Sequence, residues 1–544
     1  ASRTTTSSTS TIESIRRVSR DETLPLSFAQ ERFWFLDQLS SGSSINNIPV
    51  ALRLVGALDV EALRRSLDEI IQRHEILRAC FALRNGRPSH IIVPQLILAL
   101  DIEDLRTSVE PDREAQILRL AGEEACRPFD LANGPLIRGC LFRLDDMNHV
   151  LSLTLHHIVA DGWSMDVLRR ELASLYEAFK DGRPSPLPAL PIQYVDLIAA
   201  QRERPKGAAD RRLLEYWANQ LEGAPPLLNL PWDYPRPAIQ GHRGARHPWT
   251  LEPELARRLY EVGARYRATP FMLLVSALGL LVSRYSRQTD FCIGTPVANR
   301  AGRETEQLVG CFVNTVALRM DVSGNPSLPA LLDRVRVMVL GAQSHQDLSF
   351  ERLVDELGVV RDLGHTPLFQ VMFVLEDSPS DVRRFADLEA SRLNVGTGTS
   401  VFDLTLEMAQ KTDGSLDAVF EYSTDLFAAD TIARMAGHLQ ALLRQIVASP
   451  EASVSELSIL SPGEQALELA DSRSPREAYP QEASLHRLIE AQASKTPDAV
   501  ALQCDRGPIT YDSLNRLGNQ LARYLRVQGI VPEAPVALCV DRSL

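Results

Sequence analysis

The chain has 544 residues, of which 44% are hydrophobic, and a formal net charge of −12. This length predicts two to four domains or lobes with sizeable cores, and the negative charge argues against nucleic acid or an anionic membrane as a partner. Seven scattered cysteines without a CxxC pair predict reduced thiols and a cytoplasmic protein, and the longest apolar run, Phe271–Val282, is too short to span a bilayer.

The start of the chain is rich in serine and threonine, with a basic pair at Arg16-Arg17. This composition is typical of a flexible linker, and a tag remnant explains it equally well. The chain starts at Ala1 and stops at Leu544, so we expect it to be a piece of a longer protein.

Two helices are predicted early in the chain. Ser27 can cap the first, in the segment LPLSFAQERFWFLDQL, whose aromatic side chains we expect in the core. The second, VEALRRSLDEIIQRHEIL, repeats apolar residues at helical spacing. Around its end we expect Arg73 and Arg78 to be structural charges, and His74 to be a hydrogen-bonded residue rather than an acid or base.

The stretch 151–164, LSLTLHHIVADGWS, begins with the alternation of a strand. In that pattern His157 shares the face of three leucines, while His156 points to the opposite face. We therefore expect His157 to face an interior, where a histidine suits proton chemistry near pH 7. We expect His156 to be a buried hydrogen-bonding residue.

After the histidines, Asp161 and Gly162 close a turn, and Ser164 can cap the helix that follows. A histidine in a strand is more often a packed core residue, and this interpretation stays open from these residues alone. A metal site is a further alternative, but neighbouring strand residues diverge and no third ligand stands at useful spacing.

The second half alternates helices and strands. A proline-rich stretch at 184–191 marks a boundary between halves. Thr269 and Pro270 supply a cap and a first-turn proline for a buried helix. The remaining predicted elements are a helical hairpin from 211, strands at 291–300, 310–321 and 416–422, and a closing helix at 429–447.

The string His156-His157-xxx-Asp161-Gly162 resembles the HHxxxDG active-site motif of the condensation domains of nonribosomal peptide synthetases. Related acyltransferases of the chloramphenicol-acetyltransferase-like fold share it. Further stretches resemble the other family motifs in the family's order, over about residues 22–455. They are SFAQERFWFL at 27–36, RHEILRACF at 73–81, QYVDLIAAQ at 193–201, FCIGTPVANR at 291–300, HQDLSFERL at 345–353 and RDLGHTPLFQVMF at 361–373.

Two positions depart from the family pattern. Ser349 stands where proline is usual, which should cost little because serine tolerates the same backbone. Gly364 replaces a usual small polar residue.

The resemblance implies an α/β fold of two chloramphenicol-acetyltransferase-like lobes arranged as a V-shaped pseudo-dimer. It places the N-lobe at 22–187 and the C-lobe at 188–455, with elements crossing back from the C-lobe to cover the cleft. Residues 1–21 would link an upstream carrier domain, and 456–478 would be a second linker. Residues 479–544 resemble the N-terminal fragment of an adenylation domain, because ITYDSL matches its first motif, and this fragment lacks a Gly-rich phosphate loop.

The resemblance also implies peptide-bond formation. The substrates would be carried on the phosphopantetheine arms of an upstream donor and a downstream acceptor peptidyl carrier domain, with the chain's own adenylation domain as a third partner. No intrinsic cofactor and no metal are expected. His157 would be the general base or would position the amine, and the amide of Gly162 would face the oxyanion. Asp161 would be an anchor paired with Arg300. The other residues expected at the site are His156, Trp163, Ser164, Arg73 and Arg78.

The flanks of two motifs, HHIVADGWSMDVL and SFAQERFWFL, resemble the class that joins an L-configured donor to an L-configured acceptor. An epimerase, an ester-forming relative, a clade that modifies the amino acid during condensation and a non-catalytic recruitment platform remain alternatives. The adenylation start argues against an epimerase, and the intact histidine motif argues against a platform.

Overall fold

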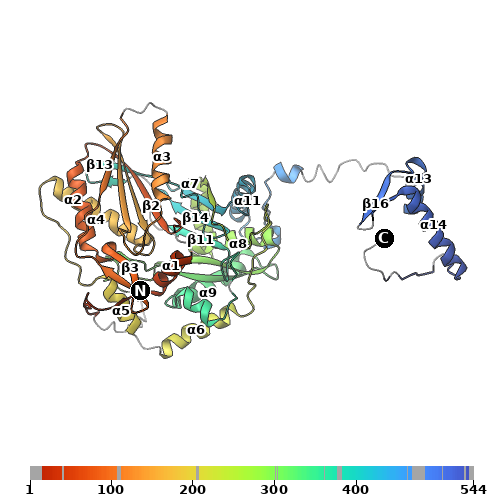
Figure 1. Cartoon of the computed structure of the whole chain (residues 1–544), viewed down its shortest axis with the longest axis horizontal. Helices are drawn as coiled ribbons and strands as arrows, with labels where there is room; N and C mark the ends of the chain where they lie inside the picture. The colour runs from red at the N-terminus through yellow and green to blue at the C-terminus, as the bar shows by residue number, and fades with distance from the viewer. Residues whose placement is uncertain are drawn as a thin grey trace. The chain divides into compact units, whose positions relative to one another are not determined.

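The computed structural model describes residues 15–39, 42–106, 112–203, 207–300, 302, 304–360, 362–376, 383–461, 463–467, 484–504, 507–531, 534–537 and 539. The chain divides into two compact units, Ala1–Glu464 and Gln465–Leu544, which are described separately (Figure 1). Most of both predicted linkers, and Arg361 of the seventh motif, lie outside the described residues.

The N-lobe sheet has the strand order β12-β13-β2-β7-β6-β5. β5 and β6 are parallel, and the other neighbours are antiparallel. Helices α2 (Val60–Arg73) and α4 (Gly162–Lys180) cover one face, and α3 (Asp112–Ala125) packs on the other. The strands are β2 (Asn47–Val55), β5 (Leu100–Asp104), β6 (Ile137–Arg143), β7 (Asn148–His156), β12 (Arg383–Phe385) and β13 (Leu388–Leu393).

Two strands of this sheet come from late in the sequence. β13 pairs antiparallel with β2, with Leu393 opposite Ala51 and Glu389 opposite Val55. The β12–β13 hairpin is therefore the element that crosses back from the C-lobe sequence. Ser391 and Arg392 of β13 line a hollow of about 480 Å³ together with residues of the C-lobe strands.

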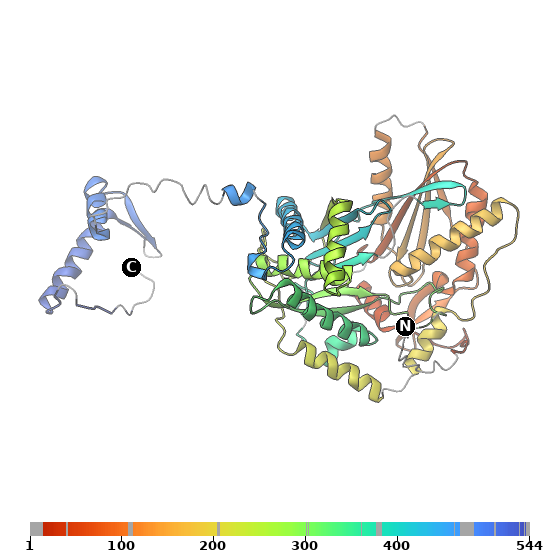
Figure 2. The ribbon, with the colours of Figure 1, turned by 180° about the vertical axis from the view of Figure 1, so that it is seen from behind.

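The C-lobe sheet has the order β10-β9-β11-β14-β15-β8, in which β11 runs parallel to both of its neighbours. The strands are β8 (Gly244–Leu251), β9 (Asp290–Val297), β10 (Asn314–Asp321), β11 (Val371–Glu376), β14 (Leu404–Gln410) and β15 (Leu416–Ser423). Figure 2 shows the helices packed beside this sheet. They are α7 (Pro253–Arg265), α8 (Pro270–Ser286), α9 (Leu328–Ser344) and α11 (Ala429–Ala448).

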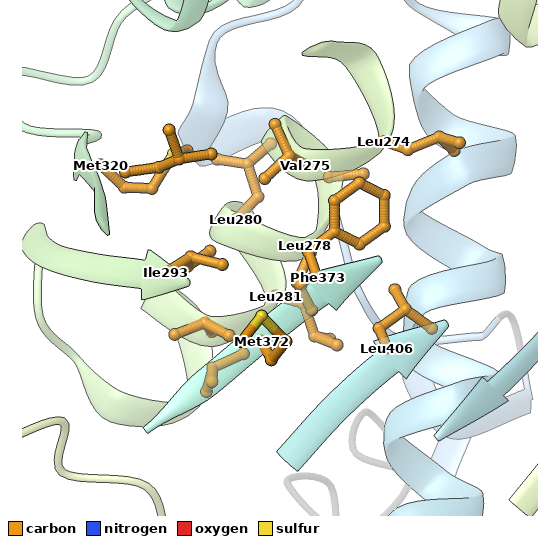
Figure 3. Packing of buried hydrophobic residues seen from close by; sticks show 14 of the residues in the cluster. Leu274, Val275, Leu278, Leu280, Leu281, Ile293, Met320, Met372, Phe373 and Leu406 are labelled. Carbon is orange, nitrogen blue, oxygen red and sulfur yellow. The ribbon is translucent and has the colours of Figure 1, made fainter. Parts of the chain in front are cut away.

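Helix α8 forms the centre of the C-lobe core. Thr269 accepts a hydrogen bond from Met272 N, and Pro270 occupies the first turn, as predicted. Apolar side chains surround the helix, so it is buried almost throughout. Figure 3 shows its side chains Leu274, Val275, Leu278, Leu280 and Leu281 beside Ile293, Met320, Met372, Phe373 and Leu406 from the strands.

Helix α1 (Phe28–Leu39) differs from its prediction in what it buries. Ser27 caps it, because Ser27 Oγ accepts from Gln30 N at 3.1 Å and Gln30 Oε1 accepts from Ser27 N at 3.0 Å. The prediction that its aromatic residues are core is wrong for Phe28 and Phe35, which are 39% and 52% exposed, because only one side of the helix packs on the N-lobe. It lies beside the small sheet of β1 (Leu24–Pro25), β4 (Arg87–Ile92) and β3 (Ala79–Arg84).

Segments around the predicted lobe boundary pack with the N-lobe. Helix α5 (Tyr194–Glu203) contributes Tyr194, Leu197 and Ile198 to the N-lobe core cluster. Upstream, Arg20 donates to the buried Asp196 at 2.6 Å and to Glu75 at 2.7 Å. The boundary at 187/188 and the linker at 1–21 stay predictions, while residue 20 is held by the N-lobe.

The two departures from the motif pattern have different consequences. Ser349 has φ −65° and ψ 144°, values that proline also adopts, and its Oγ caps α10 (Phe350–Glu356) by accepting from Arg352 N. At Gly364 an added Cβ would lie 2.8 Å from Pro237 O. Glycine at this position therefore allows a close backbone approach that a larger residue would block.

Helix α6 (Ala208–Leu221) is one helix rather than the predicted hairpin.

The second unit contains α13 (Leu485–Lys495), the antiparallel pair β16 (Val500–Cys504) and β17 (Gly507–Thr510), and α14 (Tyr511–Val527). Thr510 caps α14 by accepting from Ser513 N. The short 3-10 helices of the first unit are Glu75–Arg78 and Val454–Glu456. Across the described residues, no single helix has the length and hydropathy to cross a membrane. The helices α7 and α8, which are bent by 102° relative to one another, have that length and hydropathy only when they are taken together.

Candidate active site

His157 lies one residue beyond the strand that was predicted to carry it. β7 ends at His156, which pairs with Asn47 at the start of β2, so His157 is the first residue of a turn. Its backbone N donates to Asn46 O at 2.8 Å. The direction in which the His157 side chain points is therefore set by the turn and not by strand alternation. The ring stacks on Phe33 of α1, with centroids 5.0 Å apart and planes 21° apart.

The imidazole of His157 is held in its neutral form. Burial lowers the pKa of His157, and the charge of Arg32 adds to this, while the carboxylate of Asp161 opposes it. The backbone carbonyls of His157 and Ala160 also oppose the lowering of the pKa, although Nδ1, which is buried, forms no hydrogen bond of normal geometry with a described residue. A neutral imidazole can accept a proton at physiological pH.

His156 is the buried hydrogen-bonding residue that was expected. It is 3% exposed, and its Nδ1 accepts from Ile158 N at 3.1 Å. Phe33 and Phe129 meet its ring edge-on, with centroids 6.4 and 6.0 Å away. Burial lowers the pKa of His156 to about 3, so the residue stays neutral.

Asp161, and not Ser164, caps α4. Asp161 is extended and directly precedes the first helical residue, whereas Ser164 already lies inside the first turn. Asp161 Oδ1 accepts from Ser164 N at 2.8 Å and from Arg300 Nη2 at 3.0 Å, and Oδ2 accepts from Phe312 N at 3.0 Å. One buried carboxylate thus joins three segments of the chain.

Arg300 and Ser164 complete this network. Arg300 Nη1 donates to the carbonyls of Thr305 at 2.6 Å and Leu308 at 2.7 Å. Ser164 Oγ accepts from Arg300 Nη2 at 3.0 Å and from Gly310 N at 3.1 Å. The Arg300–Asp161 pair suggested by the resemblance is therefore present, and further bonds hold both members.

Space remains open at the start of α4. Beyond Gly162, its two chain neighbours and the backbone of its own helix, no heavy atom lies within 4 Å of the place where a Cβ on Gly162 would stand. Trp163 is 42% exposed, and its Nε1 donates to Glu306 O at 3.0 Å. The N–H groups at a helix N-terminus lack partners within the helix and carry partial positive charge, so an oxyanion is favoured there.

Arg73, Arg78 and His74 have structural contacts. Arg73 Nε donates to Glu171 Oε1 at 3.0 Å, and His74 Nε2 lies 2.8 Å from Glu171 Oε2. Arg78 donates to the backbone carbonyls of Ile71 at 3.1 Å and of Pro94 at 3.2 Å. These contacts stabilise the packing of α2 against α4 and against the loop that contains Pro94.

Two side chains beside His157 were not predicted from the sequence as part of the site. Phe33 lies within the first motif but was expected in the core, and Arg32 forms an ion pair with Glu351 of α10 at 3.5 Å. Only their position within that motif could have singled them out. In the part of the chain that the structure describes, no group of three His, Cys, Asp or Glu side chains gathers at metal-ligand spacing.

Comparison with known proteins identifies the family. A family model described as Condensation domain matches residues 20–467. The chain belongs to the condensation-domain family. It is a condensation domain of a nonribosomal peptide synthetase, and such domains catalyse peptide-bond formation.

Curated relatives of the condensation domain are large synthetases. One of the linear gramicidin synthase proteins of Brevibacillus parabrevis is 44% identical over 532 residues, which is 97% of this chain and 10% of the relative. Chondramide synthase cmdD of Chondromyces crocatus is 43% identical over 96% of this chain and 13% of its own length. The chain thus spans about a tenth of these curated relatives.

Solved structures share the fold of the condensation domain. The X-domain from teicoplanin biosynthesis is 30% identical with a TM-score of 0.72, covering 82% of this chain and 100% of that one. The four-domain nonribosomal peptide synthetase AB3403, bound to AMP and glycine, is 25% identical with a TM-score of 0.75, covering 94% of this chain and 39% of that one. The expected α/β fold of two chloramphenicol-acetyltransferase-like lobes in a V is confirmed.

Proposed function

We propose that this condensation domain joins a donor aminoacyl or peptidyl group, held as a thioester on an upstream carrier domain, to the amine of an aminoacyl group on a downstream carrier domain. The observation that carries the assignment of the site is the neutral His157 in the turn that leads to the open start of α4. Both carriers bring their substrates on phosphopantetheine arms, and we propose the chain's own adenylation domain as a third partner, in the cytoplasm.

The acceptor amine attacks the carbonyl carbon of the donor thioester. The new C–N bond forms a tetrahedral intermediate, the C–S bond then breaks, and the donor thiolate leaves. The proton lost by the amine passes through His157 to that thiolate, which becomes a thiol. Because Nδ1 is the buried ring nitrogen, we assign this transfer to Nε2.

His157 can act in two ways that experiments separate. As a general base it would contribute about 10²–10⁴ in rate and impose its own titration on the reaction. As a group that orients the amine it would contribute through positioning, which can be worth up to ~7–11 kcal/mol in favourable cases. Only the first role makes the rate follow the protonation of the imidazole.

The start of α4 is the proposed oxyanion site. The amide of Gly162 lies at the positive end of the helix dipole, where the developing negative charge is stabilised. Asp161 accepts hydrogen bonds from Ser164, Arg300 and Phe312 and holds this helix end, so we assign it an anchoring role rather than an acid–base role. His156, Trp163 and Ser164 would support the arrangement.

We infer the L-donor, L-acceptor subtype from the two motif flanks, and an adenylation start at 479–544 from the sequence match. Two observations support the adenylation start. The curated relatives align over 97% of the chain, beyond residue 467 where the family match ends, and the four-domain synthetase covers 94% of it. The boundaries of both lobes and both linkers remain proposals.

A recruitment platform is the second candidate. The X-domain of teicoplanin biosynthesis, one of the structural neighbours, was solved in complex with OxyB, so the fold also occurs in a protein–protein complex. The complete His156-His157-xxx-Asp161-Gly162 string in this chain favours catalysis over a platform.

A single-turnover assay tests the proposal. One carrier is loaded with an L-aminoacyl or peptidyl donor and a second with an L-amino acid, and intact-protein mass spectrometry follows both. We expect the acceptor carrier to gain the donor mass, and a D-configured donor to react more slowly. Loss of a water from the donor, or inversion of its configuration without transfer, would instead indicate a modifying relative. No change with any pair would favour the platform.

A further inference from the structure

We propose that Phe33 is a positioning residue for His157, and that helix α1 fixes this contact from both lobes. The inference deepens the proposed function and rests on the catalytic role assigned to His157. Phe33 itself touches the imidazole and is not assigned a part in the chemistry.

The stacking is close and nearly parallel. The rings of Phe33 and His157 lie 5.0 Å apart at 21°, while the same phenylalanine ring meets His156 edge-on at 84°. One side chain from α1 therefore contacts both histidines of the motif. Parallel, offset aromatic contact restricts rotation of the imidazole without covering the edge of the ring that carries Nε2.

The backbone carbonyls of His157 and Ala160 are the other polar groups that act directly on the imidazole of His157. The ring torsion of a histidine is broad, so packing or a hydrogen bond must select one angle. Neither carbonyl forms a hydrogen bond of normal geometry with Nδ1, and the nearby Asp161 carboxylate is occupied by Ser164, Arg300 and Phe312. The stacked ring of Phe33 therefore acts together with these carbonyls in defining the plane of the imidazole.

Helix α1 is held by two residues that lie just before Phe33. The buried Gln30 Nε2 donates to Ile158 O at 2.8 Å, which ties α1 to the turn that contains His157. Arg32 pairs with Glu351 of α10 at 3.5 Å, which ties the same turn of α1 to the C-lobe. The helix that carries Phe33 therefore contacts the turn of His157 and also α10.

The titratable and charged groups around His157 make the effect of Phe33 on its pKa measurable. They are Arg32 from α1 with its partner Glu351 from α10, His156 from β7 and Asp161 before α4. Phe33 adds an apolar cover, and burial is the largest cause of the lowered pKa of His157. Removal of the ring would let water reach the imidazole and raise its pKa toward the ordinary value.

The test compares Phe33→Ala, Phe33→Leu and Phe33→Tyr with Phe35→Ala as a control. Phe35 lies on the same helix, is 52% exposed and does not stack on His157. Single-turnover rates with saturating carriers are measured across the acid limb of the pH–rate profile, where protonation of His157 slows the reaction. We expect Phe33→Ala to slow the reaction about 10–100-fold and to raise the midpoint of that limb. Phe33→Tyr should keep both the rate and the midpoint near their wild-type values. Phe33→Leu, which keeps most of the side-chain volume but no aromatic ring, should keep the midpoint closer to the wild-type value than the rate.

A second readout does not depend on turnover. Ring-current shifts place the His157 ring protons upfield while Phe33 stacks on them, so NMR of histidine-labelled protein should lose this shift in Phe33→Leu and keep it in Phe33→Tyr. Unchanged His157 resonances and an unchanged midpoint in Phe33→Ala would overturn the inference. In the double variant with His157→Ala, the effect of the Phe33 substitution on the rate should vanish. If the rate losses of the two single variants simply add in the double variant, the positioning role of Phe33 is contradicted.

The result that would reject the proposed function differs from the result that would reject the positioning role of Phe33 alone. A wild-type rate in His157→Ala would remove the catalytic role of His157, and this inference with it, even if NMR still reports the stacked rings. An unshifted midpoint in Phe33→Ala, together with an inactive His157→Ala, would reject the positioning role alone.

Discussion

Arg300 and Asp161 form a buried ion pair between the two lobes, with Arg300 Nη2 3.0 Å from Asp161 Oδ1 and side-chain exposures of 3% and 2%. The same carboxylate caps α4 and accepts from Phe312 N. The helix end that carries Gly162 is therefore fixed by a charge from the C-lobe, and changes at this pair should affect both stability and rate.

Asp161→Ala should lower the free energy of unfolding by about 3–5 kcal/mol, because the charge of Arg300 loses its buried partner. Asp161→Asn should cost less, since an asparagine still caps the helix. Denaturant unfolding measures both. Adding Arg300→Met to Asp161→Asn should recover part of the loss, and losses that simply add would show that the two residues are not coupled.

Gly162→Ala should separate stability from catalysis. No heavy atom lies within 4 Å of the added methyl, so the free energy of unfolding should change by less than about 1 kcal/mol. The condensation rate should fall, because the methyl occupies space assigned to the substrate.

The matched control is Gly437→Ala on α11, an exposed position whose Cβ also meets open space. It should leave the single-turnover rate unchanged and stabilise the helix by about 0.5–1 kcal/mol. Equal rates for both variants would contradict the assignment of the α4 start to the substrate.

His156 should contribute to acid sensitivity. The folded protein keeps its pKa at about 3 against an ordinary 6.5, so below pH 6.5 the unfolded chain binds a proton that the folded chain does not. Stability should therefore fall as pH drops through this window, by up to about 1.4 kcal/mol per pH unit for one proton. His156→Gln, which keeps an acceptor for Ile158 N, should fall less steeply in urea unfolding between about pH 6.5 and 5, and parallel curves would refute this.

Local signals in the sequence predicted much of this molecule. Caps at Ser27 and Thr269 depend on residues within one turn, and both are present. His156 is buried as expected, but alternation did not predict this, because β7 is buried on both faces. The condensation-domain fold followed from motif order, because several spaced strings are far more specific than one.

The features that were missed depend on contacts between distant segments. Strand alternation cannot show where a strand stops, and β7 ends at the residue that pairs with Asn47, which leaves His157 in a turn. Asp161 and Ser164 are both good cap residues, and the choice followed from the start of α4. The stacking of Phe33 on His157 needs α1 to be docked, which no local pattern encodes.

The most direct test of the account is the single-turnover rate of His157→Gln beside the wild type, with both proteins shown to be folded by their unfolding transitions. We predict a loss of about 10²–10⁴ in rate. The wild-type acid limb should have its midpoint below pH 6.5, because burial lowers the pKa of His157. A folded His157→Gln that transfers the donor at the wild-type rate would contradict the central claim.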